Sequence, residues 1–125
     1  MAHTLSDQQW LDTVFPPERT EAFFEALFGG AEEGAYDIRL VYRNNDNTHL
    51  FMAFDLVQRP GKCLRCNLTY GLPEVFARHP VLNIKAVAET LGQAMGWGKT
   101  SWSLGHTEDH GPELHSIPFT LVKEA

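Results

Sequence analysis

The sequence predicts an α+β fold, a two-layer sandwich in which a mainly antiparallel sheet of about five strands carries helices packed on one face. Apolar residues recur at helical and then at strand spacing along the chain, in the order α-α-β-β-β-α-β-β. Turns of hairpin length within each group of strands favour antiparallel pairing. No linker, low-complexity tract or internal repeat divides residues 1–125, so we expect a single domain.

Two helices are expected ahead of the sheet. Ser6 is a favourable N-cap with Gln9 as its capping-box partner, which predicts a helix over about residues 6–14. Pro17 suits the first turn of a second helix, and Gly29-Gly30 ends it.

These two helices are rich in aromatic side chains. We expect most of them to belong to the core. Aromatic residues also dominate interface hot spots, so one stripe could instead bind a partner. The candidates for such a partner-binding surface are Trp10, Phe24 and Phe28.

Three strands are expected in the next part of the chain. Tyr36–Arg43 alternates apolar and polar residues, as in a half-buried strand. Leu50–Val57 is apolar at nearly every position, which is typical of a strand that is central or covered on both faces. Leu64–Tyr70 alternates again. The intervening turns are expected at Asn44–Asn47 and Arg59–Lys62, where Asn, Asp, Pro and Gly predominate.

The second half of the chain adds helix and two more strands. A short helical turn is expected over Glu74–Arg78, and Ile84–Met95 has the clearest amphipathic spacing. Trp97–Leu104 and Ser116–Val122 are the remaining strands. Either the first or the last strand of the sheet is expected at an open edge, which is a usual route to dimers.

Composition excludes some classes of partner. The chain has 16 acidic against 10 basic residues and a net charge of −6, with no run of Lys or Arg, so we expect no binding to nucleic acid. No window approaches the roughly 18–20 apolar residues of a membrane span. The N-terminal residues lack the pattern of a signal peptide, so a soluble cytoplasmic protein with reduced cysteines is expected.

Cys63 and Cys66 form a C-x-x-C motif, which suggests half of a zinc site or a redox pair. On a regular strand, however, residues three apart point to opposite faces, and their Cα atoms lie roughly 10 Å apart. A disulfide needs Cα atoms within about 7 Å. The two thiols can act together only if the turn at Pro60-Gly61 extends through Cys63. Otherwise Cys66 is a small core residue.

The segment from His106 to His115 is the richest cluster of possible metal ligands. It contains His106, His110 and His115, together with Glu108 and Asp109. A loop could fold these histidines around zinc, with the cysteine pair as further ligands. The alternative is a solvated hairpin tip, because the segment is almost entirely polar.

Asp55 is the one acidic residue embedded in an apolar strand. If it is buried, it must be paired or protonated. Arg39 or Arg65 on the flanking strands is expected to pair with it across the sheet.

Taken together, these features indicate a small acidic, non-enzymatic adaptor or chaperone-like module that binds protein, as a homodimer. No cofactor loop, nucleophile–base pair or basic patch is visible. Small acidic α+β secretion chaperones share the order β-β-β-α-β-β, which is an analogy of element order alone, since the chain carries no motif of theirs.

Two other functional classes stay open. One is a zinc-binding or redox protein that uses Cys63, Cys66 and the histidines of residues 106–115. The other is a small-molecule-binding domain with a pocket between sheet and helix. The residues expected to line that pocket are Tyr36, Tyr42, Phe54, Trp102 and Phe119.

Overall fold

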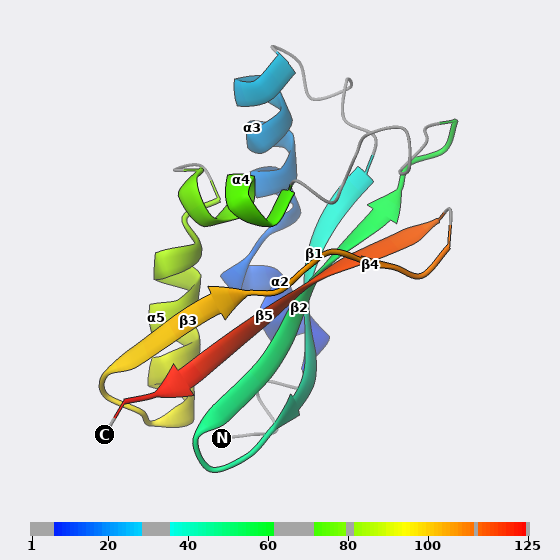
Figure 1. The fold of residues 1–125 in the computed structure, drawn as a ribbon. Helices are drawn as coiled ribbons and strands as arrows, with labels where there is room; N and C mark the ends of the chain where they lie inside the picture. Colours follow the sequence, from blue (N-terminus) through cyan, green and yellow to red (C-terminus); the bar gives the residue numbers. More distant parts are fainter. Residues whose placement is uncertain (1–6, 29–35, 62–71, 80–81, 112, 125) are drawn as a thin grey trace.

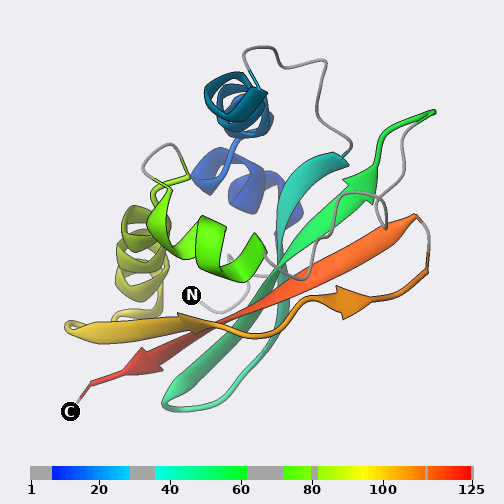
Figure 2. The same cartoon turned by 45° about the horizontal axis from the view of Figure 1, so that its top comes forward.

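A twisted antiparallel sheet forms one layer of the molecule, and the helices gather on one of its faces (Figures 1 and 2). The computed structural model describes residues 7–28, 36–61, 72–79, 82–111 and 113–124. The predicted α+β class is therefore confirmed. The helices are α2 (Gln8–Val14), α3 (Pro17–Phe28), α4 (Leu72–Arg78) and α5 (Ile84–Met95), and the strands are β1 (Tyr36–Asn45), β2 (His49–Gln58), β3 (Thr100–Leu104), β4 (Glu108–Asp109) and β5 (Leu114–Lys123).

The helix ends follow from local chemistry. The N-cap of α2 is Asp7, one residue later than the expected Ser6, because the Asp7 carboxylate accepts the backbone N–H of Gln9 at 3.0 Å. α3 begins at Pro17, as expected. α5 ends at Gly96, whose left-handed φ of 77° lets its N–H return to carbonyls of the last turn.

Part of the predicted sheet lies outside the described residues. The third expected strand, Leu64–Tyr70, falls within residues 62–71, and so do Cys63 and Cys66. The zinc and redox hypotheses that depend on this cysteine pair therefore stay predictions.

The strand order is β1-β2-β5-β3, and β4 also pairs with β5. Of the two strands expected at an edge, the first, β1, does lie at an edge of the described sheet. The last, β5, does not, because it pairs with β2 on one side and with β3 and β4 on the other. β2 is central, as its nearly continuous apolar run predicted. β4 lies in the segment expected to be a loop. Its two acidic residues carry no strand pattern and pair only because β5 extends beside them.

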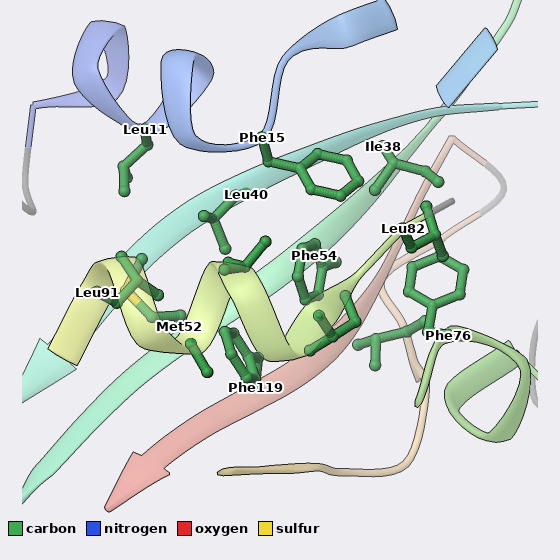
Figure 3. Packing of buried hydrophobic residues seen from close by; sticks show 14 of the residues in the cluster. Leu11, Phe15, Ile38, Leu40, Met52, Phe54, Phe76, Leu82, Leu91 and Phe119 are labelled. Carbon is green, nitrogen blue, oxygen red and sulfur yellow. The ribbon is translucent and has the colours of Figure 1, made fainter. Parts of the chain in front are cut away.

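The core lies between the two layers (Figure 3). Within the core, the buried Phe54 of β2 contacts three other aromatic rings. The Phe54 ring centroid lies 5.3 Å from that of Phe15, 5.9 Å from that of Phe76 and 5.3 Å from that of Phe119. The side chains expected to line a pocket belong to this packed cluster: Tyr36, Phe54 and Phe119 are buried, and Tyr42 and Trp102 are partly buried against them.

α5 lies close to β3. A Cβ atom added to Gly92 would stand 3.1 Å from Cγ2 of Thr100, so a larger residue at position 92 would force the Thr100 side chain to move by a few tenths of an ångström. Trp97, between the two elements, is also buried. One face of β3 is therefore fixed against a helix while the strand itself lies at the side of the sheet.

Candidate functional site

Among the described strands, β1 lies at one edge of the sheet, and β3 and β4 lie at the other. The outward backbone groups of β1 and β3 differ in their hydrogen bonding. The direction of each backbone group follows from the hydrogen bonds that flank β3. The Gly105 N–H donates to the Pro118 carbonyl at 2.8 Å, and the Lys99 carbonyl accepts the Glu124 N–H at 2.9 Å. Gly105 and Lys99 therefore face β5.

Successive residues of an antiparallel strand direct their backbone groups to opposite sides. Ser101 and Ser103 lie an even number of positions from Lys99 and Gly105, so their backbone groups also face β5. The N–H and C=O groups of Thr100, Trp102 and Leu104 must then face away from it. We call this row of outward backbone groups the β3 edge.

The β3 edge is open within the described part of the chain. No hydrogen bond between described residues reaches the outward N–H and C=O groups of Thr100, Trp102 or Leu104. The strand also carries no charged residue. Charged side chains, proline and bulges are the usual protection of edge strands, and β3 has none of them.

The side chains of β3 divide between the two faces of the sheet. Ser101 and Ser103 are exposed, whereas Trp102 and Leu104 are half-buried and pack against the core. The Trp102 ring meets that of Phe119 edge-on at 6.1 Å. A strand added to the β3 edge would therefore find apolar neighbours on the helix side and small hydroxyls on the other.

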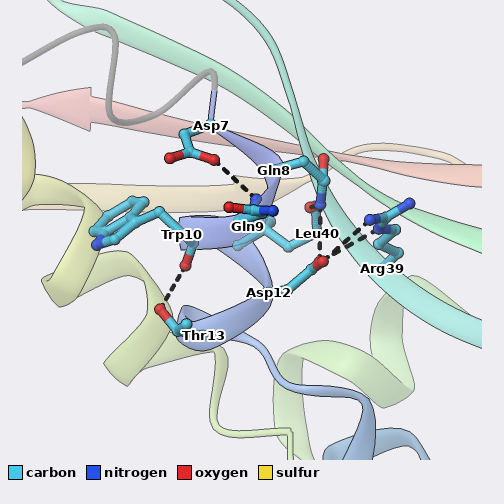
Figure 4. Close-up of polar contacts among 8 residues, drawn as sticks. All are labelled: Asp7, Gln8, Gln9, Trp10, Asp12, Thr13, Arg39 and Leu40. Atoms are coloured by element: carbon cyan, nitrogen blue, oxygen red, sulfur yellow. Dashed lines mark hydrogen bonds and ion pairs between the residues drawn. The ribbon is translucent and has the colours of Figure 1, made fainter.

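The opposite edge is partly closed, because side chains from the helices that precede it bond both outward groups of Ile38 and the carbonyl of Leu40. The Ile38 N–H donates to Oγ1 of Thr20 at 3.1 Å, and that hydroxyl lies 3.4 Å from the Ile38 carbonyl, to which it donates. Nε2 of Gln8 donates to the Leu40 carbonyl at 2.8 Å (Figure 4). We call the outward groups of Ile38 and Leu40 the β1 edge.

An ion pair lies beside the β1 edge. Nη2 of Arg39 stands 3.0 Å from Oδ2 of Asp12, and Gln8 donates to the same carboxylate at 3.0 Å (Figure 4). The hydrogen bond from Arg39 is the main reason that the pKa of Asp12 is lowered, and the same bond raises the pKa of Arg39. A hollow of about 350 Å³, with Phe15 and Thr20 in its lining, lies next to this pair.

Asp55 has a different partner from those expected. Oγ of Ser116 on β5 donates to its carboxylate at 2.7 Å, and Asp55 is only half-buried. Arg39 is its register partner on β1, but its guanidinium bonds Asp12 instead. Arg65 lies outside the described residues.

The histidines expected to bind metal are not brought together. His106 is exposed, Nε2 of His110 lies 3.2 Å from Oε1 of Glu108, and Nε2 of the buried His115 lies 3.3 Å from Oδ1 of Asp109. Across the described ranges, no group of three or more His, Cys, Asp and Glu residues is arranged to hold a metal ion.

The aromatic candidates for a partner surface have separate positions. Phe24 is 1 % exposed and belongs to the core, where its ring meets that of Tyr36. Trp10 is half-buried and packs against the same cluster. Phe28 closes α3, and its side chain lies outside the described part.

Comparisons of the chain with protein-family models, with curated proteins and with solved structures give no match. None of the helices within the described residues has the length and apolar character needed to cross a membrane. The β3 edge is the feature that sequence reasoning missed, because it expected the first or the last strand at an open edge. Its sequence signal is the uncharged stretch Thr-Ser-Trp-Ser-Leu beginning at Thr100.

Proposed function

We propose that this chain is a protein-binding module that joins other chains by adding a strand to the β3 edge. The observation that supports this function is a contrast within one sheet: side chains bond outward groups of Ile38 and Leu40 on β1, and no described residue bonds the outward groups of β3. In strand addition, main-chain hydrogen bonds supply the affinity and the flanking side chains supply the specificity. An adaptor or a chaperone-like protein can work by this means alone.

The chemistry of β3 defines the strand that it accepts. The outward N–H and C=O groups of Thr100, Trp102 and Leu104 would bond any extended backbone. Ser101 and Ser103 would leave room for side chains on the helix-free face. Trp102 and Leu104 favour apolar or aromatic neighbours on the other face, because such cross-strand pairs stabilise a sheet. The partner is therefore an extended segment with alternating apolar and small polar residues.

A displayed library of random peptides tests this function without knowledge of the natural partner. We expect selection on the whole chain, at nanomolar protein concentration, to enrich peptides with that alternation. Their binding should fall at least about tenfold in Thr100→Pro, because proline removes an outward donor and its ring blocks the edge.

A matched control separates edge pairing from general surface effects. Asn47→Pro places the same residue at the exposed β1–β2 turn, which lies on the β2 side of β5 and away from the outward groups of β3, and should leave peptide binding unchanged. The function is rejected if no peptide family is enriched, or if the enriched peptides bind wild type and Thr100→Pro equally.

A further inference from the structure

We propose that the strand occupying the β3 edge is β3 of a second copy of this chain, paired antiparallel about a two-fold axis at Trp102. This inference rests on the proposed function and names its partner. It follows from the backbone parity of β3, the symmetry of its sequence and the position of its nearest charge.

The positions of the outward N–H and C=O groups on β3 favour one register of the two strands. With Trp102 opposite Trp102 of the second copy, Thr100 lies opposite the second copy's Leu104. All three outward residues then fall in hydrogen-bonded pairs, which exchange both N–H···O=C bonds. A shift of the axis to Ser101 or Ser103 leaves an outward residue at one end of β3 without a partner within the strand.

The side chains are self-complementary in this register. Ser101 lies opposite the second copy's Ser103, so only small hydroxyls meet on the helix-free face. On the other face the two Trp102 side chains are neighbours, and aromatic cross-strand pairs are among the more stabilising. Trp102 is half-buried in the single chain, so pairing would cover surface that is still exposed.

Electrostatics do not oppose the pair locally, although each chain has a net charge of −6. The nearest charged residue is Lys99, directly before the strand. In the proposed register it lies opposite Gly105 of the second copy, so the two lysines stand at opposite ends of the interface. Like charges opposite each other would destabilise a sheet, and this register has none.

α5 would flank the paired strands. It lies over the sheet next to β3 in both views (Figures 1 and 2), and a two-fold axis normal to the sheet would place both copies of α5 on the same side. A short pair of strands alone would bury less than a stable dimer needs, so we expect the two copies of α5 to supply further contact area.

Cysteine cross-linking tests the register directly. In a background with Cys63→Ser and Cys66→Ser, Ser101→Cys and Ser103→Cys are made as separate proteins of different size. These positions form a non-hydrogen-bonded pair with Cα atoms about 4.5 Å apart, within the range of a disulfide. Identical positions would be roughly 8 Å apart, outside that range.

With oxidised glutathione as the oxidant, we expect the mixture to form the disulfide-linked heterodimer at least about tenfold faster than either protein forms a homodimer. Asn47→Cys mixed with Ser103→Cys is the matched control and should not cross-link. Equal rates for the mixture and the single variants would overturn the proposal, and so would cross-linking of Ser101→Cys alone.

Light scattering on the chain with its natural cysteines keeps the proposal testable if the serine background does not fold. We expect a dimer at tens of micromolar and a monomer for Thr100→Pro. A natural chain that is monomeric at this concentration overturns the dimer. If it is monomeric but still binds selected peptides at β3, the proposed function stands and only the identity of its partner is wrong.

Discussion

The two edges of this sheet differ in how their outward backbone N–H and C=O groups are bonded. At the β1 edge, Thr20 and Gln8 bring side-chain oxygen and nitrogen atoms to outward backbone groups, and a bulge lies between Tyr42 and Asn44. At the β3 edge, no side chain of the described residues does so, and the strand carries no charge. The helices that close β1 precede it in the chain, whereas α5 covers only a face of β3.

This difference shows that closure of an edge depends on donors and acceptors supplied from elsewhere in the fold. An unpaired strand backbone is a template for another chain unless it is covered, bulged or charged. β1 has charged Asp37 and Arg39 along its length, and β3 has serines at the equivalent alternate positions. The asymmetry predicts effects on stability at β1 and effects on association at β3.

The largest effect is expected at Thr20, which is 1 % exposed. Thr20→Val keeps the shape of the side chain but removes the hydroxyl that bonds Ile38, so we expect a loss of about 2–3 kcal/mol in the free energy of unfolding. Urea denaturation measures it. Thr90→Val on α5 is the matched control, because the Thr90 hydroxyl is exposed and bonds only its own helix. A Thr20→Val protein as stable as Thr90→Val would show that the β1 edge does not depend on this bond.

Proline substitutions on β3 should show which of its backbone N–H groups bond to β5 and which face outward. Ser103→Pro removes a donor that faces β5, whereas Thr100→Pro removes one that faces outward. We therefore expect Ser103→Pro to be less stable than Thr100→Pro by about 1–2 kcal/mol. Thermal and urea unfolding at low protein concentration measure this difference. The reverse order would mean that the outward residues have been assigned to the wrong parity.

A smaller effect is expected at Gln8. Gln8→Ala removes the bond to the Leu40 carbonyl and one bond to Asp12, which should cost about 1 kcal/mol of unfolding free energy. Gln93→Ala on the exposed side of α5 loses no such bond and serves as the comparison. If both variants unfold at the same urea concentration, Gln8 does not close the edge.

The smallest effect concerns the Asp12–Arg39 pair and depends on pH. Because the folded pKa of Asp12 lies below its ordinary value, the stabilisation is present above the unfolded pKa of about 3.9 and is lost as pH falls through the folded pKa. Arg39→Met should therefore cost about 0.5 kcal/mol at neutral pH, as usual for a partly exposed pair, and almost nothing in strong acid.

Arg78→Met on α4 is the control for the loss of a surface arginine. Its difference from wild type should not follow the same pH range. A constant deficit for Arg39→Met from neutral to strongly acidic pH would indicate lost packing in place of the ion pair.

The sequence predicted the class, β1, β2 and the helices well, because their apolar periods and caps are local signals. It could not predict that β5 lies between β2 and β3, since strand order depends on pairing between distant segments. The side-chain hydrogen bonds to the β1 edge could not be predicted either, because their partners are far apart in the sequence. Thr20 is 18 residues from Ile38, and Gln8 is 32 residues from Leu40. The open edge had only a weak local signal, the missing charges of β3.

Residue-resolved amide exchange at low and high protein concentration compares the two edges most directly. We predict that the Ile38 N–H, bonded to Thr20, is protected at both concentrations. The Trp102 N–H should exchange freely in the dilute protein and become protected in the concentrated protein, where a second strand covers it. Protection of Trp102 that does not change with concentration, or rapid exchange of Ile38, would contradict the account.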